Sequence, residues 1–95
     1  MRIRFTTRAR ADLDAIFRYV ASDRPISAAS LVEDIEKLIE NRSVYPDLGH
    51  PTQPPGRRVL TVPRAPYRVF YRVTEQEVRI LSVRHTSGRP LRTPR

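Results

Sequence analysis

The sequence has no cysteine and no tryptophan, only three glycines and one lysine, and no long run of uncharged residues. The absence of cysteine excludes a disulfide scaffold and cysteine-based zinc fingers. The longest uncharged stretch is far too short to span a membrane. The glycines are isolated from one another, which leaves nucleotide hydrolysis on a glycine-rich phosphate loop without support. The opening residues show no apolar run after their charges, so we expect no secretory leader and a cytoplasmic protein.

Positive charge is what the sequence does have. Its 95 residues carry 18 Lys and Arg against 10 Asp and Glu, a formal net charge of +8. Residues 1–50 balance eight basic groups against eight acids, whereas residues 51–95 hold ten arginines and only Glu75 and Glu77. This asymmetry indicates an anionic partner, either a nucleic acid, an acidic protein or a membrane surface, unless it is only a solvated basic face.

The first half of the chain has the apolar periodicity of two helices. One helix is predicted over residues 8–21, with Thr6 or Thr7 as its N-cap. Pro25 disfavours helical geometry before it, and a second helix is predicted over residues 27–42, capped by Ser27. The short break between them favours an antiparallel helical hairpin.

The second half of the chain is predicted to be a proline-rich loop followed by strands. Four of the nine prolines fall within residues 45–56, which we predict to be a loop. Strands are predicted over 58–62, 67–73 and 78–83, with short links that imply antiparallel pairing, and residues 2–5 predict an edge strand. The fold class is therefore α+β, a helical hairpin packed on one face of a small antiparallel β-sheet.

Domain organisation follows from length and pattern. A chain of this size supports one modest core, which we place in a single domain over residues 1–85. Residues 86–95 lack apolar periodicity and are predicted to be a basic C-terminal tail. With one sheet face in the core, Arg68 and Arg72 would lie on the other, making it the basic surface.

Few residues could support catalysis. No metal or cofactor is expected, because the two histidines, His50 and His85, are far apart in sequence and have no ligand-like spacing. Asp12 and Asp14 are two positions apart on the predicted helix, so their side chains point in different directions and cannot form an acid–base pair. We interpret them as favourable negative charge near the helix N-terminus. Phosphodiester chemistry or recognition remains as the candidate function for Arg68, Arg72, Arg79, Arg84 and His85. Arginine suits phosphate, and His85 is the one ordinary base, although a lone histidine at a strand end is commonly structural.

Several pieces of the sequence, in order, resemble the RelE/ParE superfamily of type II toxins, and its ParE-like branch most. They are Ile3-Arg4-Phe5-Thr6 with Ala9, Asp12-Leu13, Ile16 and Tyr19; Pro46-Asp47-Leu48-Gly49; Arg58-Val59-Leu60; residues 67–73; and residues 78–85. The resemblance spans about residues 3–89. It implies a βααβββ fold and a growth-inhibiting toxin neutralised by a cognate, ParD-like antitoxin with an acidic C-terminal segment. The sequence leaves open whether toxin and antitoxin form a dimer, a heterotetramer or a larger assembly.

The cellular target that the resemblance implies depends on which branch of the superfamily the chain resembles. ParE-like toxins inhibit DNA gyrase, whereas RelE-like toxins cut messenger RNA in the ribosome and carry basic residues where this chain has Val59 and Thr61. Some of these nucleases also use a tyrosine near the C-terminus that has no counterpart here after Tyr71. Arg68 matches the arginine that the nucleases place on the phosphate. His85 matches a histidine that is common to both branches. Arg89 corresponds to the arginine that usually follows this histidine, at a slightly longer spacing.

The function predicted from the sequence is therefore a ParE-like gyrase inhibitor with no catalytic residues, with no membrane partner and with nucleic acid at most an indirect partner. Its antitoxin- or target-binding residues are predicted to be Arg58, Arg68, Arg72, Arg79, Arg84, His85 and Arg89. Two alternatives stay open. One is a ribosome-dependent endoribonuclease that uses Arg68 and His85, and the other is a non-toxic module that binds an antitoxin or a nucleic acid.

Overall fold

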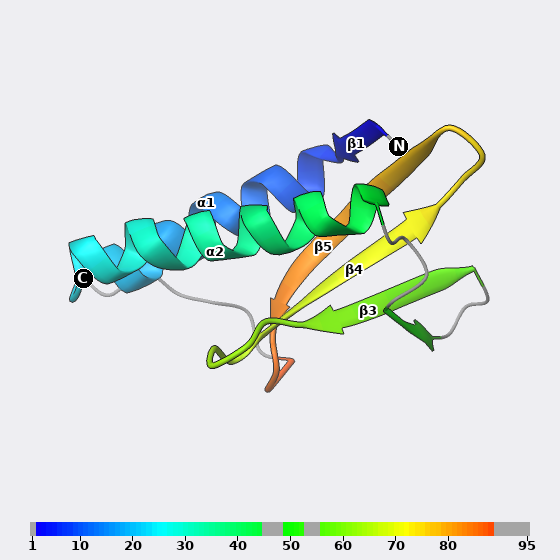
Figure 1. Cartoon of the computed structure of the whole chain (residues 1–95). Helices are drawn as coiled ribbons and strands as arrows, with labels where there is room; N and C mark the ends of the chain where they lie inside the picture. Colours follow the sequence, from blue (N-terminus) through cyan, green and yellow to red (C-terminus); the bar gives the residue numbers. More distant parts are fainter. Residues whose placement is uncertain (1, 45–48, 53–55, 89–95) are drawn as a thin grey trace.

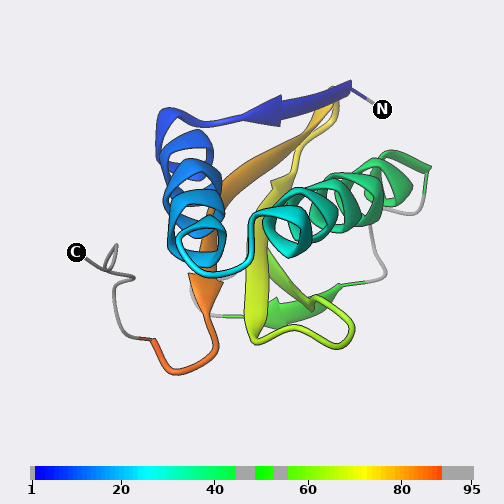
Figure 2. The same cartoon turned by 90° about the vertical axis from the view of Figure 1, so that its left-hand side faces the viewer.

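Two helices and a five-stranded sheet make up the part of the chain that the structure, a computed structural model, describes: residues 2–44, 49–52 and 56–88. The elements are β1 (Arg2–Phe5), α1 (Thr7–Ala21), α2 (Pro25–Val44), β2 (His50–Thr52), β3 (Arg57–Thr61), β4 (Tyr67–Val73) and β5 (Glu77–His85). The two helices lie side by side and cover one face of the sheet (Figures 1 and 2). The predicted α+β fold is confirmed.

The start of each helix is set by a residue that suits a helix N-terminus. The Thr6 hydroxyl accepts a hydrogen bond from the Ala9 N–H at 3.1 Å and so caps α1, as predicted. α2 begins at Pro25, and the prediction that Ser27 caps it is wrong. Proline suits the first helical position, where its missing N–H would have no intrahelical partner. The Arg24 carbonyl accepts the first bond of α2, from the Ala28 N–H at 2.9 Å.

The sheet has the order β1-β5-β4-β3-β2. The hairpins β3–β4 and β4–β5 are antiparallel, as expected, but β1 at the edge pairs parallel with β5. β2 was not predicted. It lies in the stretch that we read as a loop, and Pro51 is tolerated there because β2 is an edge strand.

One apolar core joins both helices to the covered sheet face. Its fully buried side chains, all below 2% exposed, include Ile16, Ile35, Ile39, Val69, Tyr71, Val78 and Ile80. Ile3 and Phe5 of β1 pack against this cluster from the edge. No helix in the described residues has the length and apolar character needed to cross a membrane.

Candidate binding surface on the open sheet face

The sheet face turned away from the helices is rich in arginine. Because side chains alternate along strands, the pairing register places ten of the outward residues in three rows across the sheet, beside a further outward pair, Arg2 and Glu77. The first row is Thr61, Arg68 and Arg84; the second is Val59, Phe70 and Ser82; the third is Arg57, Arg72, Arg79 and Arg4. We call these ten residues the arginine face. Two arginine rows therefore flank a row without charge.

A β-bulge decides which residues of β5 reach this face. The register between β4 and β5 shifts at Phe70/Tyr71, so Phe70 pairs with Ser82 while Tyr71 pairs with Ile80. Leu81 is the extra residue. An inserted residue reverses the alternation beyond it, which lets Arg79 and Arg84 share one face although they are five positions apart.

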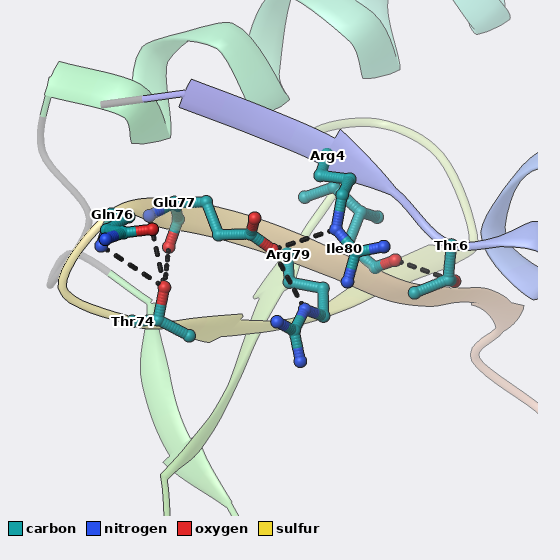
Figure 3. A network of polar contacts seen from close by, with 7 residues as sticks. All are labelled: Arg4, Thr6, Thr74, Gln76, Glu77, Arg79 and Ile80. Atoms are coloured by element: carbon teal, nitrogen blue, oxygen red, sulfur yellow. Dashed lines mark hydrogen bonds and ion pairs between the residues drawn. The ribbon is translucent and has the colours of Figure 1, made fainter.

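Two arginines of the third row share one carboxylate (Figure 3). Glu77 Oε2 accepts from Arg4 Nε on β1 and from Arg79 Nε on β5, both at 2.9 Å. The hydrogen bond from Arg4, and then that from Arg79, hold the pKa of Glu77 below its usual value. The turn before Glu77 is closed by the Thr74 hydroxyl, which accepts from the Gln76 N–H at 3.4 Å and the Glu77 N–H at 3.1 Å.

The other four arginines of the face have no such partner. Within the described residues, the side chains of Arg57, Arg68, Arg72 and Arg84 make no ion pair or hydrogen bond. Arg57 instead stacks its guanidinium carbon 4.9 Å from the centroid of the Phe70 ring, with its Nε buried and unpartnered. Arg57 pairs across strands with Arg72, and Arg68 with Arg84. Like charges directly opposite one another destabilise a sheet, so an anionic partner would relieve a cost built into this face.

Two of the predicted binding residues lie elsewhere. Arg58 pairs with Tyr71 on the helix side of the sheet, and its Nη1 donates to the Gly49 carbonyl at 2.8 Å. Tyr71 also holds Gly49, because its hydroxyl accepts from the Gly49 N–H at 2.9 Å. This hydrogen bond from Arg58 fastens the chain at the start of β2.

His85 is also on the helix side. It pairs with the buried Tyr67, whose ring meets the His85 ring edge-on at a centroid distance of 5.5 Å. The His85 Nδ1 accepts from the Ser87 N–H at 3.1 Å. Burial, and to a lesser degree the nearby Tyr19, raise the pKa of Tyr67. Arg68 and His85, the pair required by the ribonuclease alternative, thus point to opposite faces. Arg89 lies outside the described residues.

The N-terminal end of α1 holds β5 where β1 no longer covers it. Thr6 Oγ1 lies 2.9 Å from the Ile80 carbonyl and 3.1 Å from that of Leu81, and shares its proton between them. Asp12 Oδ2 accepts from the Val83 N–H at 3.0 Å. Asp12 is therefore a strand-binding residue, and α1 has no acid in its first turn. The dipole interpretation of Asp12 misses this tertiary contact, whose partner is 71 positions away in sequence.

Arg57 and Arg4 also join the surface without having been predicted. Arg57 is two positions before Val59 in β3, so strand alternation could have placed both side chains on the same face. Arg4 reaches the face only through the parallel β1–β5 pair. Among the described residues, no group of three or more His, Asp or Glu gathers as a metal site would.

Solved structures share this fold over most of its length. A chain of the chromosomal ParDE toxin–antitoxin system of P. aeruginosa superposes with a TM-score of 0.79 and 34% identity, covering 90% of this chain and 95% of that one. A chain of the RelBE2 toxin–antitoxin complex of Mycobacterium tuberculosis gives a TM-score of 0.59 and 28% identity, covering 88% and 95%. The YoeB dimer of Staphylococcus aureus, 16% identical with a TM-score of 0.63, shares the fold. The protein is a type II toxin of the RelE/ParE superfamily.

The sequence comparisons narrow this class. The family described as the ParE toxin of the type II toxin–antitoxin system parDE matches residues 3–90, and the chain belongs to this family. Y4kP of Sinorhizobium fredii is 37% identical over 84 residues, which cover 88% of this chain and 86% of that protein. Toxin RelE2 of Caulobacter vibrioides is 30% identical over 83 residues, covering 87% and 92%.

Proposed function

We propose that this toxin inhibits DNA gyrase by protein contact, without catalysis, in the cytoplasm, and is neutralised by a ParD-like antitoxin. Membership of the ParE toxin family supports the target, and the similarity to chains of ParDE and RelBE2 toxin–antitoxin systems supports the antitoxin partner. The arginine face is the surface that we assign to antitoxin or target.

One observation supports the proposal that the toxin acts without catalysis. Cleavage of RNA through its own 2′-OH requires a general base within hydrogen-bond reach of that hydroxyl. The three rows of the arginine face offer arginine, threonine, valine, phenylalanine and serine. The adjacent carboxylate of Glu77 is engaged by two arginines, and His85 is on the far side of the sheet. Among the residues that the structure describes, an ordinary base therefore does not stand beside the cations that would hold a phosphate.

A supercoiling assay tests the target. Purified full-length toxin, titrated into gyrase with relaxed plasmid and ATP, should block the appearance of supercoiled product. The double variant Arg68→Gln/Arg84→Gln should be weaker, because it removes two exposed, unpaired charges from the face. Arg24→Gln, which removes one charge from the turn between the helices, is the matched control and should inhibit like the wild type. Undiminished supercoiling at a large excess of toxin would contradict the proposal.

The ribonuclease alternative keeps some support from the relative named RelE2 and from the exposed Arg68 and Arg84 pair. Incubation with ribosomes translating a defined message decides it. Cleavage that disappears in His85→Ala would establish this alternative against ours, and an intact message would exclude it. Normal growth of cells expressing the chain without an antitoxin would instead favour a non-toxic binding module.

A further inference from the structure

The arginine face has a regular pattern along each strand as well as across the sheet. On β4, Arg68, Phe70 and Arg72 are successive outward residues, and β3 repeats a similar order with Val59 and Arg57. Four residues of strand span roughly 13 Å, with the uncharged row midway. A ligand that fits all three rows must present negative charge, then an apolar group, then negative charge over this length.

A helix lying along the strands has this spacing. Residues i, i+4 and i+8 fall near one side of a helix and are spaced by about 6 and about 12 Å along its axis. A helix also satisfies its own backbone hydrogen bonds, whereas an extended segment laid on the face of a sheet would leave its N–H and C=O groups without partners. Because α1 and α2 cover only the other face, an added helix would complete a third layer (Figure 2).

A nucleic acid fits the same surface less well. Its backbone is charged at every step and would cross an uncharged middle row of Val59, Phe70 and Ser82. Base stacking is the use that a nucleic acid would make of an aromatic ring in that row. One side of the Phe70 ring is already occupied by the Arg57 guanidinium, 4.9 Å from its centroid.

We infer that the arginine face binds an amphipathic helix that carries carboxylates at i and i+8 and an apolar side chain at i+4, aligned with β4. The carboxylates meet Arg68 with Arg84 at one end and Arg72 with Arg57 at the other. The apolar side chain packs on Phe70 and Val59 between them. This inference rests on the proposed function, since the antitoxin is the partner expected to carry the helix, but its test requires neither gyrase nor an identified antitoxin.

Fluorescence anisotropy with designed peptides tests the pattern on the full-length protein. The probe is a labelled, alanine-rich 18-residue peptide with Glu, Leu and Glu at i, i+4 and i+8. Three matched peptides replace both Glu by Gln, replace the Leu by Ala, or place a proline in the centre. A labelled 20-base-pair DNA duplex is the competing ligand. We expect the first peptide to bind and each altered peptide to bind at least about fivefold more weakly, as for a central contact in an interface.

Protein variants locate the binding. Arg68→Gln and Arg72→Gln should each weaken the first peptide by roughly two- to fivefold, the range of one exposed ion pair, and Arg24→Gln should leave it unchanged. Circular dichroism confirms that each variant is folded. If the peptide binds but gyrase is not inhibited, this inference is supported and the proposed gyrase target is refuted. If gyrase is inhibited but the peptide does not bind, only this inference is refuted.

Three results would overturn it. If the Gln peptide or the proline peptide binds as well as the first, the acid–apolar–acid helix is not what the face recognises. If Arg24→Gln weakens binding as much as Arg68→Gln, the interaction is only general charge attraction. If the duplex binds more tightly than the peptide and loses affinity in Arg68→Gln, the face is a nucleic-acid surface.

Discussion

Tyr71 and Gly49 provide a test of how the sheet edge beside the arginine face is held. The Tyr71 side chain is fully buried in the core, and its hydroxyl accepts from the buried N–H of Gly49 at 2.9 Å. This bond fastens the residue directly before β2, which in turn pairs with β3. Tyr71→Phe keeps the ring and removes the hydroxyl, so it isolates the hydrogen bond from the packing.

The expected cost follows from what is left behind. Without the hydroxyl, the Gly49 N–H is buried and lacks this acceptor, which typically costs about 1–3 kcal/mol. For a domain of this size each kcal/mol corresponds to about 4–8 °C in melting temperature. Thermal unfolding followed by circular dichroism should therefore show Tyr71→Phe melting clearly below the wild type, by at least about 4 °C.

Two further variants sharpen the test. Tyr19→Phe, at a tyrosine that is 40% exposed, is the matched control and should change the free energy of unfolding by less than about 0.5 kcal/mol. Gly49→Ala should destabilise more than Tyr71→Phe, because a Cβ at this position would lie 2.8 Å from two ring carbons of Tyr71. If Tyr71→Phe melts with the wild type, the hydroxyl does not hold Gly49 and the reasoning is refuted.

Three more predictions concern stability. Asp12→Ala should lower the free energy of unfolding by about 1–3 kcal/mol in urea denaturation, because the Val83 N–H loses its carboxylate acceptor; Asp14→Ala, which breaks only an exposed pair with Arg18, is the control. Glu77→Gln should flatten the loss of stability in acid. The lowered pKa of Glu77 stabilises the fold above its unfolded value of about 4.3, and this contribution disappears as the pH falls through the folded pKa. Tyr67→Phe should flatten the alkaline side, because a raised pKa stabilises the fold below about pH 10 and this is lost as the pH rises further. Acid or alkaline unfolding curves identical to the wild type would contradict the last two.

Local signals in the sequence were sufficient for much of the fold. The Thr6 cap, the apolar stripes of both helices and the alternation over residues 67–73 each depend on neighbours a few positions apart, and all three are confirmed. The same rules failed where several prolines masked a short edge strand at His50–Thr52. They also misplaced the start of α2, because Pro25 takes the first helical position, two residues before the predicted serine cap.

The sequence predicted part of the arginine face. Arg68, Arg72, Arg79 and Arg84 share the open face, but Arg58 and His85 point to the helix side and Arg57 and Arg4 were missed. Strand alternation makes a one-residue error decisive, since it moves a side chain to the opposite face. The bulge at Leu81 adds such a step within β5, and the composition does not reveal it.

The sequence by itself determined the α+β fold class and the basic charge, whose excess belongs to the second half of the chain, because composition and periodicity are local properties. Only the tertiary structure decided which arginines are free and which are occupied. Glu77 reaches Arg4 across a parallel strand pair, and Arg58 turns to Gly49, whereas four side chains of the arginine face make no hydrogen bond or ion pair with the described residues. The physical reason is that these pairings depend on strand register and on contacts between residues far apart in the chain.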